Sequence, residues 1–216
     1  LVWLNSGSRI RYPDSFKGEE RIVYIEGEAY FDVESDPSRP FIVKSPSICT
    51  KATGTEFNIL DYKTSNFPEV TLVEGIVTVC PAVGKDSGIV VSRLETDQHL
   101  VLNNSTGLTE ITKGDTYKYI SWKDGKIIFR NDPLTYVVKK LSQIYNVEIE
   151  LKGKEIYSYS YHATFKDESL EEILNLLKTS SPIDFTELKR ESLPDGSFPK
   201  KKIIIFSSIQ PVSNED

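Results

Sequence analysis

The sequence predicts two domains, an all-β domain over residues 1–121 and a small α+β domain over residues 122–216. Short runs of β-branched and aromatic residues, separated by Gly, Pro, Asp and Ser turns, fill the first part without a helical stretch of useful length. The last third contains one strand–helix–strand pattern twice, with matched positions 36 residues apart. A chain of 216 residues allows two domains of about 100 residues, each large enough for its own hydrophobic core.

Eleven strands are expected in the first domain, at 1–4, 8–12, 20–25, 28–33, 41–44, 48–52, 56–62, 70–74, 76–79, 88–94 and 108–111. Gly7, Gly27, Gly54 and Gly75 stand beside these runs at spacings of 20, 27 and 21 residues. Because Gly enters positive φ at little cost, we expect corners there at which the sheet folds over on itself. A β-roll, a short solenoid and a two-layer sandwich all fit this pattern.

The second domain opens with a hairpin-type turn predicted at 123–126 and a short strand at 127–129. Polar Asn131 and Asp132 precede Pro133, which is the order of residues that a helix start prefers. Apolar residues then follow a helical period, and Asn146 is expected to stop the helix before a strand at 147–151. The helical face consists of Leu134, Val137, Val138, Leu141, Ile144 and Tyr145.

The same pattern returns from Phe165 onward, where Ser169 and Glu172 form a capping box that predicts a second helix start. Strands are expected at 157–165, 183–188 and 202–206, the last two pairing with each other. Two βαβ repeats of this kind predict two small helices packed on one face of a single sheet.

Composition excludes several classes of function. Acidic residues outnumber basic ones by 32 to 26, and this balance argues against nucleic acid as a partner. No run approaches the roughly 20 apolar residues of a membrane helix. The chain begins within a strand and contains no Met, so we expect it to be a piece of a longer protein. No phosphate-binding or nucleophile motif appears, and the spacing of His and Cys gives no metal site, so we expect no cofactor and no metal.

Two pairs of side chains are candidates for chemistry, one of carboxylates and one of thiols. Glu26 and Glu28 share a strand face at period 2 and are the only enzyme hypothesis that we retain, although solvated carboxylates at a strand corner are far more common. Cys49 and Cys80 are interpreted as small buried residues. They can pair if their strands are neighbours in an oxidising compartment.

A surface for a protein partner has more support. Ile203 and Ile205 belong to an apolar strand that can lie at a sheet edge and accept a partner strand. Tyr157, Tyr159 and Tyr161 alternate along one predicted strand, so that they form either a core face, which is favoured, or a recognition face.

Several sequence motifs of this chain resemble those of the periplasmic part of FecR-family anti-sigma regulators. They are Val2-Trp3-Leu4-Asn5-Ser6-Gly7-Ser8, Gly27-Glu28-Ala29-Tyr30-Phe31-Asp32-Val33, Gly54-Thr55-Glu56-Phe57-Asn58, Val70-Thr71-Leu72-Val73-Glu74-Gly75 and Ser121-Trp122-Lys123-Asp124-Gly125-Lys126. The C-terminal domain is similar to the short N-terminal domains of secretins and TonB-dependent receptors. The resemblance covers nearly the whole chain, with the motifs in the family's order.

The resemblance implies the periplasmic domain of a single-pass inner-membrane protein. Its partner is then the signalling domain of a TonB-dependent outer-membrane receptor, and an upstream segment absent here binds an extracytoplasmic-function sigma factor. The resemblance implies no catalytic residues. The alternative that the residues leave open is a periplasmic glycan-binding or small-molecule-binding module with an aromatic-lined pocket inside residues 1–121.

Overall fold

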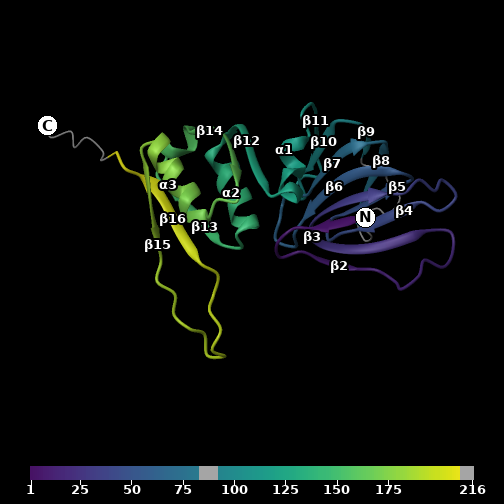
Figure 1. Ribbon diagram of the computed structural model, residues 1–216, viewed down its shortest axis with the longest axis horizontal. Helices are drawn as coiled ribbons and strands as arrows, with labels where there is room; N and C mark the ends of the chain where they lie inside the picture. Colours follow the sequence, from purple (N-terminus) through teal and green to yellow (C-terminus); the bar gives the residue numbers. More distant parts are fainter. Residues whose placement is uncertain (83–91, 210–216) are drawn as a thin grey trace. The chain divides into compact units, whose positions relative to one another are not determined.

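The computed structural model describes residues 1–82 and 92–209 (Figure 1). The chain divides into two compact units, Leu1–Asp124 and Gly125–Asp216, which are called here the first and the second unit. The sequence predicts a domain boundary between residues 121 and 122, and the boundary between these two units in the chain lies between residues 124 and 125. Within the described residues, every helix is too short or too polar to cross a membrane.

The described residues of the first unit form eleven strands that hydrogen-bond into one continuous sheet. Its path is β11-β10-β7-β6-β3-β4-β5-β8-β9, and β1 and β2 both pair with β3. The strands are β1 (Val2–Leu4), β2 (Arg9–Arg11), β3 (Arg21–Val33), β4 (Phe41–Lys44), β5 (Ile48–Ala52), β6 (Thr55–Asp61), β7 (Glu69–Glu74), β8 (Ile76–Pro81), β9 (Ser92–Glu95), β10 (Gln98–Leu102) and β11 (Thr109–Lys113).

The sheet curls because β3 belongs to two layers. Its first part pairs with β2 and β4, whereas its second part pairs with β1 and β6. The curved strands enclose one apolar core, to which β3 to β10 all contribute, and Figure 1 shows them arching around that common interior. Phe31 and Phe57 stack at its centre with ring centroids 5.2 Å apart. The expectation of a sheet that folds over on itself is confirmed by this pairing.

The predicted glycine corners are confirmed, since Gly7, Gly27, Gly54 and Gly75 all have positive φ. Gly27 lies within β3, where φ is +112°. A Cβ atom there would come within 2.8 Å of the Cα of Ser8, so the bend and the close approach of the neighbouring chain both require Gly. This corner lets one strand serve both layers.

The first unit departs from the prediction at three places. Strand β3 is continuous over Arg21–Val33, where two separate strands were expected. Strand β10 (Gln98–Leu102) was missed, because the buried His99 interrupts its apolar pattern. The end of the unit is helical, with α1 (Tyr117–Ile120) and the 3-10 helix η1 (Ser121–Asp124) in place of β structure and of the hairpin-type turn. The predicted strand at 88–94 lies partly outside the described residues.

The two cysteines are neighbours on adjacent strands. Cys49 of β5 stands directly opposite Cys80 of β8 in the antiparallel register. Both side chains are half-buried, while the alternate positions of the same strands, such as Ile48 and Val79, are fully buried in the core. The interpretation of the cysteines as small core residues is therefore wrong, because period-2 alternation places them on the outer face of the sheet.

Through residue 209, the second unit has two α-helices of equal length, α2 (Leu134–Ile144) and α3 (Leu170–Ser180). Each follows one strand and precedes another. The remaining elements are β12 (Lys126–Pro133), β13 (Glu148–Lys152), the 3-10 helix η2 (Glu155–Ser158), β14 (Ser160–Lys166), β15 (Ile183–Glu187) and β16 (Lys202–Ser207).

The expectation of one shared sheet is wrong. Strands β12 and β14 form a two-stranded antiparallel sheet, and β13, β16 and β15 form a separate three-stranded sheet in that order. The two strands that flank each helix therefore lie in different sheets (Figure 1). Both sheets and both helices still share a single core, in which Phe129, Leu141, Ile173 and Ile205 are fully buried.

Only some of the predicted helix ends agree with the structure. The capping box of Ser169 and Glu172 is confirmed, with the Glu172 carboxylate accepting a hydrogen bond of 2.7 Å from the Ser169 N–H. Asn146 takes positive φ just after α2 ends, as expected for a stop. The predicted cap of α2 is wrong, because Pro133 itself is the N-cap and Asp132 accepts a hydrogen bond from the Arg130 N–H at 2.7 Å.

Candidate partner-binding surface

The two carboxylates of the enzyme hypothesis do not form a catalytic pair. Glu28 is 1% exposed and accepts hydrogen bonds from the amides of Asn5 and Asn58 at 2.6 and 3.0 Å. Glu26 is partly exposed and pairs with Lys63 at 3.0 Å. The bend at Gly27 breaks the period-2 relation between them, so the two side chains occupy separate environments.

Metal-binding groups are likewise dispersed. Across residues 1–82 and 92–209, no three side chains of His, Cys, Asp or Glu gather closely enough to hold a metal ion. The buried His99 contacts the Thr71 hydroxyl at 2.8 Å through Nδ1 and stacks on Tyr119 with ring centroids 3.6 Å apart. These contacts pack α1 against the sheet, which is a structural role.

The three tyrosines do not share one face. Tyr157 lies in η2 and is 52% exposed, whereas Tyr161 lies in β14 and is 6% exposed. Tyr159 stands between the two elements and packs partly against the core. The prediction of one alternating strand is wrong, because a helical turn at 155–158 changes the direction of successive side chains. Tyr161 is a core residue, as the favoured interpretation holds.

Ile203 and Ile205 do not stand at a sheet edge. Strand β16 is central, paired in parallel with β13 on one side and antiparallel with β15 on the other. Their side chains are 2% and 0% exposed. The prediction that a partner strand can add to β16 is wrong. Its parallel neighbour β13 lies about 50 residues upstream, and no short-range sequence pattern predicts that pairing. Lys201 and Lys202 form ion pairs with Glu187 and Glu150 at 2.6 and 2.9 Å.

Among the described residues of the second unit, four strands are paired on one side only and so have an open edge: β12, β13, β14 and β15. Natural proteins protect such edges with charges, Pro residues and bulges, since an unprotected edge accepts any extended chain. Strand β12 carries a bulge between Arg130 and Asp132 and ends at Pro133. Strand β13 exposes Glu148, Glu150 and Lys152 in alternation.

Strand β14 is the least protected of the four. Its sequence, Ser-Tyr-His-Ala-Thr-Phe-Lys, contains no Pro, and its one Lys or acidic residue, Lys166, stands at its last position. Its pairing with β12 is regular from Lys166 to His162. Strand β15 carries both Asp184 and Glu187. The open edge of β14 is therefore the position in this unit at which a partner strand meets the fewest obstacles.

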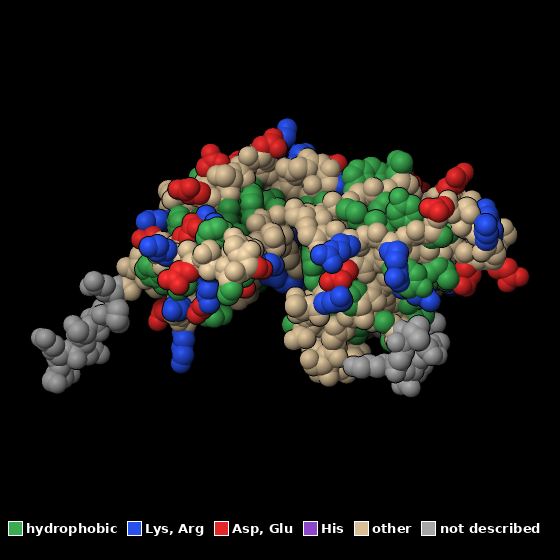
Figure 2. Space-filling model, turned by 90° about the horizontal axis from the view of Figure 1, so that it is seen from below, with side chains coloured by type: hydrophobic (Ala, Val, Ile, Leu, Met, Phe, Trp, Pro, Cys, Tyr) green, Lys and Arg blue, Asp and Glu red, His purple; other side chains and the backbone are tan. Residues whose placement is uncertain are grey.

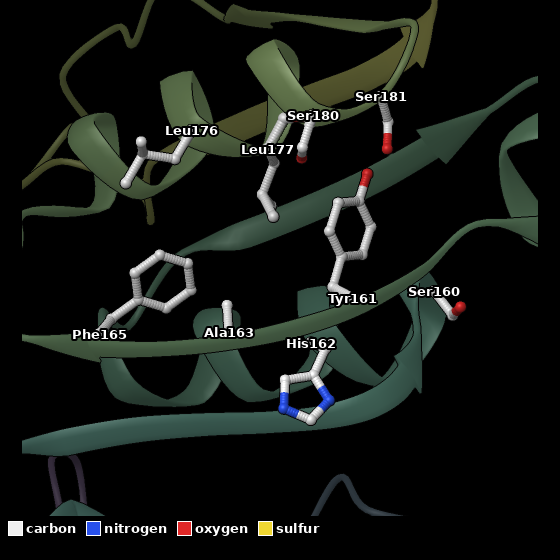
Figure 3. Close-up of a pocket in the computed structure, with 9 residues that line it drawn as sticks. All are labelled: Ser160, Tyr161, His162, Ala163, Phe165, Leu176, Leu177, Ser180 and Ser181. Carbon is white, nitrogen blue, oxygen red and sulfur yellow. The ribbon is translucent and has the colours of Figure 1, made fainter.

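A groove of about 380 Å³ lies beside that edge, between β14 and the C-terminal half of α3 (Figure 3). Tyr161, Ala163 and Phe165 point from the strand toward the helix, whereas His162 points away. Leu176 is 50% exposed on the helix side and Leu177 is 2% exposed. The complete lining is Ser160, Tyr161, His162, Ala163, Phe165, Leu176, Leu177, Ser180 and Ser181.

The groove combines apolar walls with polar groups at one end. The hydroxyl of Tyr161 points toward Ser181 (Figure 3), whose side chain is its polar neighbour in the groove and partly opposes the effect of burial on its pKa. Burial raises the pKa of Tyr161, so the hydroxyl keeps its proton at neutral pH.

A second groove, of about 390 Å³, opens in the first unit between β1 and β2. Its walls are almost entirely apolar and include three aromatic rings. They consist of Val2, Leu4, Ile10, Tyr12, Phe16, Val23 and Phe41. Sites for polar small molecules place several hydrogen-bonding groups around the ligand, and here the Tyr12 hydroxyl is the single polar side-chain group of the lining.

Charge is mixed on the face drawn in Figure 2, where acidic and basic side chains are interspersed. On this face Lys and Arg form no continuous track of the kind that a phosphate backbone requires.

Comparison with known proteins gives matches over most of the chain. The family model described as FecR protein matches residues 1–78, and the model described as FecR, C-terminal matches residues 126–193. Two crystal structures of a candidate anti-sigma factor from Parabacteroides distasonis ATCC 8503, at 1.65 and 2.50 Å resolution, have TM-scores of 0.78 and 0.77 to this chain. Each is 27% identical, with 96% of this chain and 90% of that chain covered. No match was found among curated proteins.

Proposed function

Because this chain belongs to the FecR family of regulators, we propose that it is the periplasmic signal-transmitting part of a membrane-anchored anti-sigma factor. It receives a signal from the signalling domain of a TonB-dependent outer-membrane receptor. An upstream segment of the same protein then releases an extracytoplasmic-function sigma factor. In this role the chain acts by binding and not by catalysis.

The observation that carries the proposal is the open edge of β14 beside its groove. A signal relay through the periplasm requires a surface that recognises another folded protein. Strand addition supplies affinity through backbone hydrogen bonds, and pockets for alternate side chains supply specificity. Strand β14 pairs on one side only among the described residues, which leaves a side for a partner strand, and the groove supplies the pocket.

The groove's composition indicates what enters it. Its walls are Phe165, Leu176 and Leu177, which fit an apolar side chain, and Tyr161 and Ser181 lie at the polar end. We therefore expect the receptor domain to contribute an extended strand with an apolar residue facing α3. A strand with a carboxylate at that position is disfavoured, because the groove holds no Lys or Arg to neutralise it.

The first test is a calorimetric titration of this chain with the signalling domain of the receptor encoded beside its gene. The expected result is saturable binding with one receptor domain per chain and a negative heat-capacity change, because apolar surface is buried. A folded chain that shows no heat of binding at any temperature with that domain contradicts the proposed function.

A second test asks whether the receptor domain contacts the groove beside β14. Leu176→Lys puts a charge into the groove at a side chain that is half exposed, so that folding is retained. Complete burial of a Leu contributes about 1.5–3 kcal/mol, so covering its remaining half contributes about 1 kcal/mol, or about fivefold in Kd. The desolvation of the new ammonium group weakens binding further.

The matched control is Leu193→Lys, which adds the same charge at a Leu that is 45% exposed and lies outside the groove. It should bind as the unchanged chain does. If the unchanged chain binds and both variants bind equally well, the relay function stands but the groove is not the contact. The two failures are thus distinguishable.

The groove between β1 and β2 supports a second candidate function, the binding of an apolar small molecule by the first unit. A glycan is less suited, since sugar hydroxyls require several polar partners. Val2 and Leu4 of β1 line this groove, whereas the ring of Trp3 between them packs against Tyr30, so the test is a calorimetric titration with a long-chain fatty acid. No heat of binding at millimolar ligand removes this candidate.

A further inference from the structure

We propose that Cys49 and Cys80 are a site of reversible covalent modification, in which they form an intramolecular disulfide between strands β5 and β8. The two residues face each other in the antiparallel register. Both are half-buried on the outer face of the sheet, where an oxidant can reach them. The inference goes beyond the proposed function and does not depend on it, although an oxidising periplasm would supply the reaction partner.

The register fixes how close the two cysteines lie. The Ala82 N–H donates to the Ser47 carbonyl at 2.9 Å, which makes those two residues a hydrogen-bonded pair of the ladder. Such pairs alternate along antiparallel strands, so the pair two residues further, Cys49 with Cys80, is also hydrogen-bonded. The Cα atoms of such a pair are about 5.5 Å apart, within the range of about 4.4–6.8 Å that a disulfide spans.

The same geometry indicates a reducible disulfide. Directly opposite Cβ atoms lie about 4.5–5.5 Å apart, toward the upper end in hydrogen-bonded pairs, whereas a disulfide needs about 3.5–4.5 Å. The strands must therefore approach each other locally when the disulfide forms. Strained and exposed disulfides have higher reduction potentials than buried structural ones and are the ones that exchange. We expect this disulfide to open again under mild reduction.

The reaction needs a disulfide-containing oxidoreductase, or oxidised glutathione, as the oxidant. The thiolate of one cysteine attacks the oxidant's disulfide, forms a mixed disulfide and releases one thiolate of the oxidant. The thiolate of the second cysteine then attacks the chain's sulfur in the mixed disulfide and releases the other. Two thiols of the chain lose two electrons, the oxidant's disulfide gains them, and the two protons pass to the oxidant's sulfurs.

The reaction rate should depend on pH. Burial, followed by the neighbouring Cys80, raises the pKa of the Cys49 thiol, while Lys44 on the adjacent strand β4 partly opposes this. Because the thiolate is the attacking species, oxidation should accelerate as pH rises from 7 toward 9.

The test is oxidation of the folded chain with oxidised glutathione, followed by unfolding, maleimide labelling and mass spectrometry. The expected product is a monomer that takes up no maleimide and has lost about 2 Da, the two thiol hydrogens. Treatment with dithiothreitol should restore two labelled thiols. The Cys49→Ser and Cys80→Ser variants should instead carry one glutathione each.

A comparison with the unfolded chain separates native geometry from mere proximity in sequence. The oxidised form should be favoured at least about tenfold more in the folded chain than in 8 M urea, because the sheet holds the two sulfurs together. Two maleimides or two glutathiones on the folded chain, a disulfide-linked dimer, or equal oxidation in urea would each overturn the proposal. Circular dichroism of both variants checks that they remain folded.

Discussion

The corner at Gly27 can be tested by substitution. In Gly27→Ala, the new Cβ atom meets the backbone Cα of Ser8 at 2.8 Å, and φ stays at +112°, where a side chain is strained. In the unchanged chain the Glu28 N–H donates a hydrogen bond of 2.8 Å to the Oγ of Ser8, and displacement of Ser8 would break this hydrogen bond. Strained φ costs about 1–3 kcal/mol and the steric overlap about 1–3 kcal/mol more, so the first unit should lose about 2–6 kcal/mol.

Gly18→Ala is the matched control for this corner. Gly18 has φ of +106°, nearly the same strain, but a Cβ atom there meets nothing within 4 Å. The change in unfolded-chain entropy is the same in both variants and cancels. Gly18→Ala should therefore cost about 1–3 kcal/mol less than Gly27→Ala, the difference being the contact with Ser8.

Urea unfolding followed by tryptophan fluorescence measures both losses. Trp3 and Trp122, the two tryptophans of the chain, belong to the first unit, so their emission reports on that unit alone. Equal free-energy losses for the two variants would refute the close approach at Gly27. A Gly27→Ala variant as stable as the unchanged chain would refute the corner altogether.

Three further predictions concern the second unit and a buried carboxylate. Ser169→Ala removes the capping box of α3 and should cost about 1 kcal/mol, measured by the helical circular dichroism signal during urea unfolding; no loss would contradict the cap. Leu177→Ala, at 2% exposure, should cost about 2–5 kcal/mol, whereas Leu176→Ala, at 50% exposure, should cost under about 0.5 kcal/mol; similar losses would contradict the core assignment. Burial raises the folded-state pKa of Asp61, so the folded state holds a proton that the unfolded state releases, and stability relative to Asp61→Asn should fall as pH rises above about 4. A relative stability that rises over that range would show that the hydrogen bonds from Ser45 and Ser47 outweigh burial.

Features that depend on residues close together in the chain were predicted from the sequence. The glycine corners follow from backbone sterics, and the start of α3 follows from Ser169 and Glu172, which lie three residues apart. Both helices occupy the positions that their apolar period marks, because amphipathic spacing and burial are two expressions of one pattern. The end of α2 before Asn146 belongs to the same class of short-range signal.

The neighbours of each strand in its sheet were not predicted from the sequence. An apolar run such as 202–206 reads equally well as an edge strand or a central strand, and only its parallel pairing with β13 decides. The same limit applies to Cys49 and Cys80, whose apposition depends on strands separated by β6 and β7. Tyr157 was misplaced for another reason, since a single 3-10 turn leaves no periodic signature. The groove beside β14 was missed because it joins the face of one strand to a helix that follows it.

Hydrogen exchange of this chain, free and saturated with the receptor's signalling domain, tests most directly whether the chain receives its signal through the β14 edge. A strand added there gives hydrogen-bond partners to the outward-facing amides of β14 (Ser160–Lys166). Those amides should exchange at least about tenfold more slowly in the complex, while the edge strands β13 and β15 keep their rates. Unchanged exchange throughout β14 in a saturated complex, or slowing confined to β13 or β15, would contradict the account.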